Sequence, residues 1–284
     1  MVPALTSLAH GVLVRRHCRK AGVSLLEIVD VRKSYGSEAD PYLALGGIDL
    51  TIEEGEFLCL LGPSGCGKST LLNILAGFEQ PTSGDVSANG APVRGSGRDR
   101  VMLFQDAGSA LFPWLTVEEN MRFGLRVRRV PQQEWPRVID HYLRMVDLDQ
   151  HRRKFPAQLS GGMRQRLQIA RALAVEPGVL LMDEPFAALD ALTRRRMHVA
   201  LLDIWRQTRK TIVFVTHDIG EAVTLADRIC IMSVGPGSTI SRVLAVDQPR
   251  PRDLRDPAVA RLFIEIEELL APDMARSEVR ERAA

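Results

Sequence analysis

Cysteine is scarce in this sequence and follows no motif. The four cysteines are Cys18, Cys59, Cys66 and Cys230. None of them forms a Cys-X-X-Cys pair, which excludes the common zinc-binding and thiol-redox motifs. Scattered thiols of this kind fit a reducing cytoplasm, and a chain of 284 residues can bury enough surface to hold a core without disulfides.

Long apolar runs are also missing. No stretch reaches the roughly 18 consecutive apolar residues that a membrane-spanning helix needs, so we expect no transmembrane segment. Residues 1–23 include a mildly apolar stretch, but positive charges follow it, whereas a secretory signal carries them first. We therefore predict that residues 1–23 form a loosely ordered N-terminal extension; a membrane-surface anchor is the alternative.

An excess of one charge sign is absent as well. The 37 lysines and arginines nearly balance the 35 aspartates and glutamates, for a net charge of +2. This balance excludes a protein that depends on a strong positive field, so we expect no nucleic-acid partner. With 45% hydrophobic and 25% charged residues the composition is that of a globular protein. The length allows about two domains, or one domain with an inserted subdomain.

The order of the apolar segments predicts an α/β fold. Strand patterns precede residue 106, and helical patterns dominate residues 106–175, where Thr116 and Glu119 form a capping box. After Val179, short apolar runs alternate with helical segments, as parallel strands buried on both faces do. The predicted strands are 25–31, 43–52, 55–62, two short ones within 84–104, 179–183, 211–216 and 228–233.

Turn and helix signals complete this outline. Residues 36–41 predict a turn, and residues 68–75 a helix that ends before Gly77. Residues 248–256 are a linker rich in proline and arginine, and residues 272–284 are polar and expected to fray. Between them, one apolar helical face is predicted, formed by Leu262, Phe263, Ile266, Leu269 and Leu270.

A glycine-rich segment carries the clearest chemistry. Residues 62–69 read GPSGCGKS and match the phosphate-binding pattern GxxxxGK[ST]. Glycines let the backbone turn so tightly that successive N–H groups face one concavity, and the helix that begins near Lys68 adds its positive dipole end. We expect Lys68 to reach the β- and γ-phosphates and the Ser69 hydroxyl to bind Mg²⁺. Cys66 occupies a free position of the pattern, and no role is expected for it.

A pair of acidic residues follows the apolar run at 179–182. Asp183 and Glu184 should lie at the carboxyl edge of the sheet, where open α/β sheets bind their ligands. We expect Asp183 to hold Mg²⁺, directly or through water, and Glu184 to polarise the attacking water.

A third motif points to a family. Residues 159–163 read LSGGM and are followed by RQRLQIARAL, and together with the motifs above they make the chain resemble the ATP-binding cassette (ABC) ATPases over roughly residues 25–244. The resemblance implies a P-loop NTPase (RecA-like) core with an antiparallel β subdomain and an inserted α-helical subdomain. It divides the chain into an extension at 1–23, an ABC ATPase domain at 24–245 with its helical subdomain at about 106–175, and a C-terminal linker, helix and tail at 246–284.

The resemblance also assigns roles to single residues. Gln105 is the Q-loop glutamine, which would contact Mg²⁺ or the attacking water; Asp190 belongs to the D-loop, and His217 is the switch histidine that senses the γ-phosphate. Tyr35 stands where the family's adenine-stacking aromatic usually lies, and Tyr42 is the alternative. The expected ATP-binding residues are Tyr35, Gly62, Pro63, Ser64, Gly65, Cys66, Gly67, Lys68, Ser69 and Thr70.

The signature motif implies a dimer. Ser160, Gly161 and Gly162 precede a helix whose first amides, with the serine hydroxyl, can bind an anion. In this family they cap the ATP held by the other subunit of a head-to-tail homodimer, which one chain type can build because the pairing is two-fold. His198 has no partner at a motif spacing and is interpreted as a surface or packing residue.

The segment after Gln105 bears on what the ATPase drives. Residues 106–120 resemble those of ATPases that serve importers of nitrate, sulfonates, taurine and related solutes. The resemblance implies import through a membrane permease, an indirect solute-binding protein partner, and a peripheral place on the cytoplasmic face of the inner membrane. Phe112 and Trp114 have two interpretations, aromatic packing at a helix entry and part of the groove for the permease's coupling helix. Trp114 lies further from Gln105 than in the family's commonest form, which leaves the transported subgroup open.

Other classes of function are less consistent with the sequence. Soluble ABC ATPases of DNA repair or translation usually carry a long coiled-coil insertion or two cassettes, and this sequence shows neither. A non-catalytic regulator would lack Glu184 or His217, and both are present. An exporter ATPase stays an alternative because cassette motifs do not encode the direction of transport.

Overall fold

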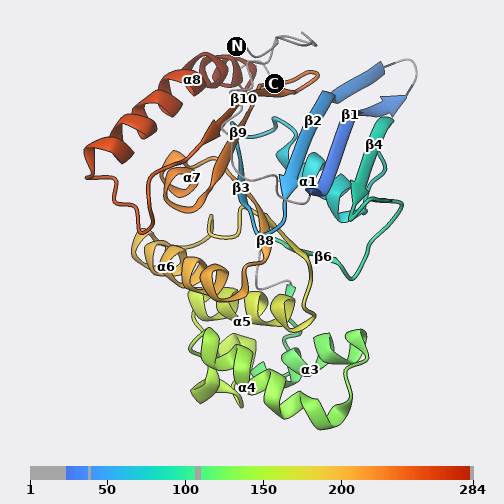
Figure 1. Ribbon diagram of the computed structural model, residues 1–284, viewed down its shortest axis with the longest axis vertical. Coiled ribbons are helices and arrows are strands. Elements are labelled where there is room, and N and C mark those ends of the chain that lie inside the picture. The colour runs from blue at the N-terminus through green and yellow to red at the C-terminus, as the bar shows by residue number, and fades with distance from the viewer. Residues whose placement is uncertain (1–23, 38–39, 106–109, 282–284) are drawn as a thin grey trace, which may run out of the picture.

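The computed structural model describes residues 24–37, 40–105 and 110–281 (Figure 1). The predicted extension at 1–23 and the first four residues of the predicted helical subdomain, 106–109, lie outside the described residues. In the described part, two sheets pack around the short helix α1 (Lys68–Ala76), and a group of helices extends from one end of the larger sheet (Figure 1).

The smaller sheet is antiparallel, with strand order β2-β1-β4-β5. The strands predicted at 25–31 and 43–52 are confirmed but are longer, because β1 and β2 form a hairpin that continues through the predicted turn and pairs Tyr35 with Tyr42. Asn89 and Gly90 join β4 and β5 with φ angles of 51° and 72°, the left-handed conformation that a tight hairpin turn requires. The strands are β1 (Ser24–Ser37), β2 (Asp40–Glu53), β4 (Ser83–Ala88) and β5 (Ala91–Pro92).

The larger sheet has the order β10-β9-β3-β8-β7-β6. Strands β3, β6, β7, β8 and β9 run parallel, as their apolar sequences predict, whereas β10 pairs antiparallel with β9 at the edge. The sequence analysis missed β10 because only its first residue, Ile240, is buried, so no apolar run marks it. The strands are β3 (Phe57–Leu61), β6 (Arg100–Leu103), β7 (Val179–Asp183), β8 (Thr211–Thr216), β9 (Arg228–Met232) and β10 (Ile240–Ala245).

Both faces of the larger sheet are covered. In β3, Leu58 and Leu60 face helix α1 (Lys68–Ala76) and the antiparallel sheet, while the alternate residues of the strand face the core formed with α5, α6, α7 and α8. Burial on both faces explains why these strands read as unbroken apolar runs. The helices on the second face include α6 (Ala191–Thr208) and α7 (Ile219–Leu225).

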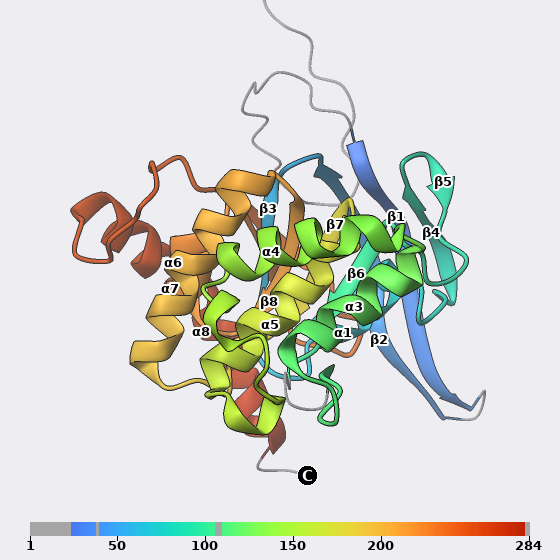
Figure 2. The same cartoon turned by 90° about the horizontal axis from the view of Figure 1, so that it is seen from below.

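The predicted helical subdomain is helical where the structure describes it (Figure 2). The capping box at the start of α3 is confirmed: Thr116 Oγ1 accepts from Glu119 N–H at 3.3 Å, and Glu119 accepts from Thr116 N–H at 2.8 Å. The elements are α3 (Val117–Arg128), η1 (Gln132–Glu134), α4 (Trp135–Met145), η2 (Asp149–His151), η3 (Pro156–Gln158) and α5 (Gly161–Ala174).

The C-terminal helix is longer than predicted. Helix α8 (Pro257–Glu281) continues through Pro272, so the prediction that residues 272–284 fray is wrong up to Glu281; residues 282–284 lie outside the described part. Leu262, Ile266 and Leu270 are buried on its predicted apolar face. Just beyond the proline, Asp273 is 8% exposed and pairs with Arg276 at 3.5 Å, contacts that support the helix where its sequence alone suggests an end.

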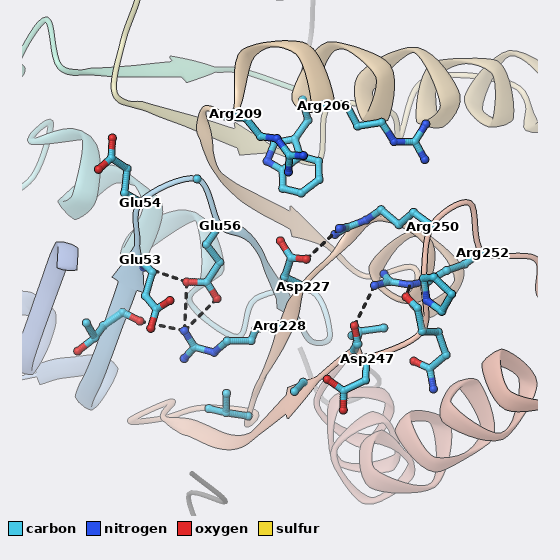
Figure 3. Close-up of a pocket in the computed structure, with 18 residues that line it drawn as sticks. Glu53, Glu54, Glu56, Arg206, Arg209, Asp227, Arg228, Asp247, Arg250 and Arg252 are labelled. Atoms are coloured by element: carbon cyan, nitrogen blue, oxygen red, sulfur yellow. Dashed lines mark hydrogen bonds and ion pairs between the residues drawn. The ribbon is translucent and has the colours of Figure 1, made fainter. Parts of the chain in front are cut away.

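The linker before α8 is held by a buried arginine. Arg252 is 8% exposed and donates to the carbonyls of Val223, Ala226 and Val246 at 2.6 to 2.9 Å. It lies beside an open cavity of about 940 Å³ at the amino ends of β3 and β9, where Arg250 pairs with Asp227 (Figure 3). The Arg252 guanidinium therefore holds the linker against the C-terminal end of α7.

Removing this guanidinium is expected to destabilise the fold. We expect Arg252→Ala to lower the free energy of unfolding by about 3 kcal/mol, because buried carbonyls lose charge-assisted hydrogen bonds. Urea denaturation followed by circular dichroism measures the loss. Arg255→Ala is the control, since Arg255 pairs with Asp253 in solvent, and it should cost less than about 1 kcal/mol. Equal midpoints for the two variants would contradict the anchoring role.

Candidate functional site

The loops that follow four neighbouring strands meet at the carboxyl edge of the larger sheet. Pairing of Leu61 with Thr216 brings the glycine-rich loop after β3 beside His217. Pairing of Asp183 with Val215 places the acidic pair after β7 next to the same histidine. Gln105 emerges at this edge too, two residues beyond Leu103, which pairs with Met182. The strand register thus gathers the residues expected at the phosphates.

The glycines of the loop meet specific steric demands. A Cβ on Gly62 would lie 2.9 Å from both the Cys66 sulfur and the Met232 carbonyl oxygen. Gly67 caps α1 with a φ angle of 87°, and a Cβ there would lie 2.8 Å from Leu45. Only glycine fits both positions without displacing its neighbours. Cys66, for which no role was expected, is 1% exposed and fills the inside of the loop.

Lys68 lies at the centre of this loop. Its side chain is 5% exposed, and its ammonium donates to the carbonyls of Gly62 and Pro63, each at 2.7 Å. It also lies 3.6 Å from the Cys66 sulfur, whose thiol pKa is raised by burial. The positive charge is therefore held within the loop, beside the backbone amides of the α1 start.

Ser69 and Asp183 form a pair of oxygen ligands between two elements. The Ser69 hydroxyl, in the first turn of α1, donates to Asp183 Oδ1 at 3.1 Å at the end of β7. Burial raises the pKa of the Asp183 carboxyl, and the bond from Ser69 opposes that rise. A hydroxyl and a carboxylate at this distance are hard oxygen donors.

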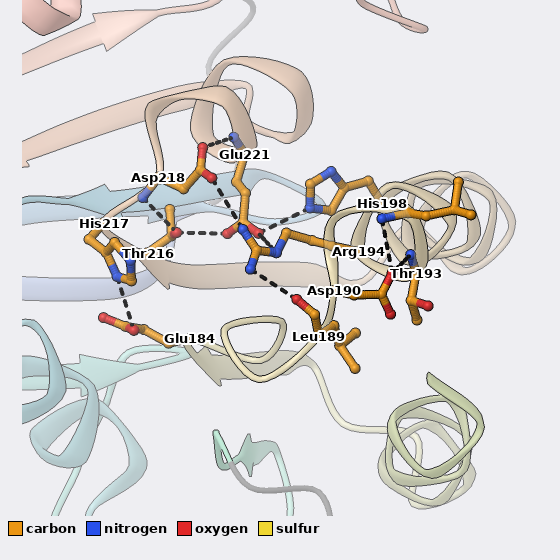
Figure 4. A network of polar contacts seen from close by, with 11 residues as sticks. Glu184, Leu189, Asp190, Thr193, Arg194, His198, Thr216, His217, Asp218 and Glu221 are labelled. Carbon is orange, nitrogen blue, oxygen red and sulfur yellow. Dashed lines mark hydrogen bonds and ion pairs between the residues drawn. The ribbon is translucent and has the colours of Figure 1, made fainter. Parts of the chain in front are cut away.

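Glu184 turns away from its strand toward His217. Its φ angle is 41°, and its N–H donates to the Val215 carbonyl at 3.1 Å. This left-handed conformation is rare for a residue with a side chain, and strain of this kind is typical of functional sites. It brings Glu184 Oε2 within 3.1 Å of His217 Nδ1 (Figure 4). Carboxylate and imidazole thus form a polar pair at the sheet edge.

Of the two candidate tyrosines, Tyr35 contacts the helix that follows the loop. Its hydroxyl donates to Glu79 Oε2 at 2.6 Å and lies 3.4 Å from the Thr70 hydroxyl. Burial is the main cause that raises the Tyr35 pKa, and the bond to Glu79 adds to it. The Lys33 ammonium lies 5.0 Å from the centre of its ring, which is partly open to solvent. Tyr42, opposite in the hairpin, is more exposed.

The signature and D-loop residues lie at the starts of two other helices. Ser160 caps α5 and accepts from Met163 N–H at 3.3 Å. A Cβ on Gly162 would lie 2.8 Å from Thr193 on α6, so this glycine is also required for helix packing. Asp190 caps α6 through the amides of Leu192 and Thr193, and these bonds lower its pKa. Within one chain, each of these motifs therefore has a structural role as a helix start.

Sequence reasoning missed a network behind the site. Glu221 is 5% exposed and contacts His198 at 3.1 Å, so His198 has a polar partner in addition to its packing against Phe186. No spacing rule could find this pair, because the two residues lie on different helices. The Asp–Ile–Gly–Glu run at 218–221, which starts a helix directly after His217, was the available signal.

Known proteins are similar to this chain over most of its length. The family model described as ABC transporter matches residues 45–187. The chain is 44% identical over 241 residues to the nitrate import ATP-binding protein NrtD of Synechococcus elongatus, covering 83% of this chain and 87% of that protein. It is 49% identical over 232 residues to the bicarbonate transport ATP-binding protein CmpC of the same species, covering 81% of this chain but only 35% of the longer protein.

A solved structure agrees with the fold. A dimeric ATP-binding cassette in a post-hydrolysis state, bound to ADP and Pi, matches with a TM-score of 0.67 and 32% identity. The match covers 79% of this chain and 100% of that one. The expected P-loop NTPase architecture, with both sheets and the helical subdomain, is thereby confirmed.

Proposed function

Because this chain belongs to the ABC transporter family of ATP-binding subunits, we propose that its ATP hydrolysis powers import of a small solute through a membrane permease. Nitrate, sulfonates, taurine and bicarbonate are the candidate solutes. The observation that carries the proposal is the convergence of the phosphate loop and the Glu184–His217 pair at one sheet edge. The chain that forms this edge aligns over more than 80% of its length with a nitrate import and a bicarbonate transport ATP-binding protein.

The chemistry of hydrolysis is distributed over this edge. The loop amides and Lys68 would bind the β- and γ-phosphates, with Tyr35 against the adenine and Gln105 near the attacking water. Glu184 accepts the proton of that water, and His217 holds the Glu184 carboxylate while contacting the γ-phosphate. Catalysis of this kind rests on positioning and electrostatic stabilisation more than on covalent chemistry.

The residues present fit a magnesium ion. Ser69 and Asp183 offer two hard oxygen donors 3.1 Å apart, with Gln105 at the same edge. Burial raises the pKa of the Asp183 carboxyl, which supports a role for a nearby cation. The ion would neutralise charge on the phosphates when bound. Asp183 and Ser69 would hold it there, and its binding would keep Asp183 ionised.

A homodimer supplies the remaining parts of each site. Ser160, Gly161 and Gly162 of one subunit would contact the ATP on the other, and Asp190 would lie at the same interface. The dimeric state of the similar solved cassette supports this arrangement. The three signature residues start α5 with amides that point out of the helix, which suits them to an anion brought by a second copy.

An aromatic surface on the helical subdomain suits the permease. Trp114 is 70% exposed beside Phe112, whose ring lies 4.5 Å from that of Phe123. The buried Asn120 side chain holds this loop by bonding both the N–H and the carbonyl of Phe112. A fixed loop that presents an exposed tryptophan is typical of a protein interface. We infer that the permease's coupling helix contacts Trp114.

The location follows from these partners. Among the described residues, no helix has both the length and the apolar character to cross a bilayer. As a transporter ATPase, the protein associates peripherally with a membrane complex. We propose the cytoplasmic face of the inner membrane, where ATP is available, with a solute-binding protein as an indirect partner on the far side.

Co-purification from membranes tests this function. Tagged Glu184→Gln, with ATP and magnesium, is expected to recover an integral membrane permease from solubilised membranes of the native host. Adding Trp114→Ala should lower the recovered permease several-fold, because a central aromatic anchor contributes about 2 kcal/mol or more. Val199→Ala on the exposed face of α6 is the control for loss of an apolar side chain. Recovery of soluble or nucleic-acid-associated proteins alone would contradict the transport function. Export of solute by the reconstituted complex would contradict import and show an exporter instead.

A further inference from the structure

One guanidinium joins the D-loop to the segment that carries the switch histidine. Arg194, in the first turn of α6, donates to the Leu189 carbonyl at 3.0 Å. The same group lies 3.5 Å from the Asp218 carboxylate and 3.8 Å from that of Glu221, both at the start of α7 (Figure 4). Leu189 directly precedes Asp190, and Asp218 directly follows His217. Arg194 therefore spans two loops that are otherwise separate in the sequence.

The Glu221 carboxylate that Arg194 faces has further polar partners of its own. Glu221 accepts from the Thr216 hydroxyl at 2.7 Å and contacts His198 at 3.1 Å. The Thr216 hydroxyl accepts from Asp218 N–H at 3.0 Å, so both neighbours of His217 belong to the network. A carboxylate as buried as that of Glu221 is costly without cationic or hydrogen-bonding partners. The network is thus a connected polar unit directly behind His217.

We propose that Arg194 is a positioning residue for ATP hydrolysis, which holds the D-loop and the His217 segment as one rigid unit. The inference rests on the proposed roles of Glu184 and His217. A planar guanidinium can donate a hydrogen bond to a carbonyl while it forms ion pairs with two carboxylates, whereas an ammonium cannot face all three groups in the same geometry. Without it, His217 is free to shift relative to Glu184, 3.1 Å away. Since Asp190 would face the second subunit, Arg194 also links dimer closure to His217.

Steady-state hydrolysis tests this role. We expect Arg194→Gln to lower kcat about tenfold or more, since small misplacements of catalytic groups cost up to about 10²-fold. The affinity for ATP should stay within about twofold, because the residues that the Arg194 guanidinium faces, Leu189, Asp218 and Glu221, lie outside the phosphate loop. Arg194→Lys should keep most of the defect. Arg196→Gln, at an exposed position two residues further on α6, is the matched control and should hydrolyse ATP as the unmodified protein does.

A merely structural role predicts a different pattern. It would lower thermal stability and ATP affinity together, and that result would overturn the inference, as would an unchanged kcat in a folded Arg194→Gln. Combining Arg194→Gln with Glu221→Gln provides a second criterion. If the two residues act through each other, the double variant is no slower than the slower single variant; additive losses would contradict the network.

Two further variants keep the test decisive. If Arg194→Gln does not fold, Thr216→Val removes only the hydroxyl between Glu221 and Asp218, and it should also lower kcat at unchanged ATP affinity. Unchanged kcat in that variant would overturn the proposal.

Glu184→Gln separates the role of Arg194 from the catalytic assignment of Glu184 and His217 on which it rests. If it hydrolyses ATP normally, the assignment of the catalytic pair fails; if it is inactive while the Arg194 variants are unaffected, only the role of Arg194 fails.

Discussion

Glu184→Gln should bind ATP and dimerise but hydrolyse ATP about 10²- to 10⁴-fold more slowly than the unmodified protein. This is the usual loss of rate, about 10²- to 10⁴-fold, when a general base is removed. The exchange keeps the size of the side chain and a hydrogen-bonding partner for His217 at 3.1 Å. It removes the negative charge that accepts a proton from water. The left-handed backbone of Glu184 should persist, because its N–H remains bonded to the Val215 carbonyl.

Single-turnover and steady-state phosphate release measure this effect, with analytical ultracentrifugation in ATP to show the trapped dimer. Glu176→Gln is a matched control, since Glu176 precedes β7 while Glu184 follows it, and Glu176 pairs with Arg128 at the opposite end of the strand. We expect normal turnover for that variant. Normal turnover of Glu184→Gln would mean that another group activates the water, and the proposed pair with His217 would lose its catalytic meaning.

Much of the site could be predicted because its signals are local. Glycine is needed at Gly62 and Gly67 because a Cβ there would meet a few neighbouring atoms, so the phosphate loop can be recognised from a short stretch of sequence. Strands β3, β7, β8 and β9 of the larger sheet are buried on both faces, which makes their ends easy to locate in the sequence. Because polar residues such as Asp183 and His217 follow those ends directly, the edge at which they meet was predictable from strand order and direction.

The parts that could not be predicted depend on contacts distant in sequence. Strand β10 exists because it pairs with β9, and its own residues are mostly half-exposed. Helix α8 continues past Pro272, where the local sequence favours a stop, and beyond the proline Asp273 is buried and pairs with Arg276 of the next turn. His198 meets Glu221 across two helices, and periodicity within either helix says nothing of this pair. The roles of residues at the dimer interface, such as Ser160, come from the family resemblance and stay predictions.

Lys68→Ala is expected to weaken ATP binding about 10²-fold or more. The ammonium of Lys68 is the positive charge held inside the loop, and each charge-assisted hydrogen bond to phosphate contributes about 1.5–3 kcal/mol. Since about 1.4 kcal/mol corresponds to tenfold in affinity, loss of one or two such bonds gives this range. Titration with a fluorescent ATP analogue in the presence of magnesium measures it.

The lysine also holds its own loop, and a second measurement separates the two contributions. Removing the ammonium leaves the carbonyls of Gly62 and Pro63 without its bonds, so some loss of thermal stability is expected as well. A loop that is merely loosened would weaken binding of ADP and ATP equally, whereas loss of contacts to the β- and γ-phosphates should weaken ATP more. Lys154→Ala, at an exposed position of the helical subdomain, is the control for loss of a positive charge and should bind both nucleotides normally. An unchanged ATP affinity in Lys68→Ala would overturn the assignment of residues 62–70 as the phosphate loop, because no arrangement of the amides alone replaces a buried cation at that place.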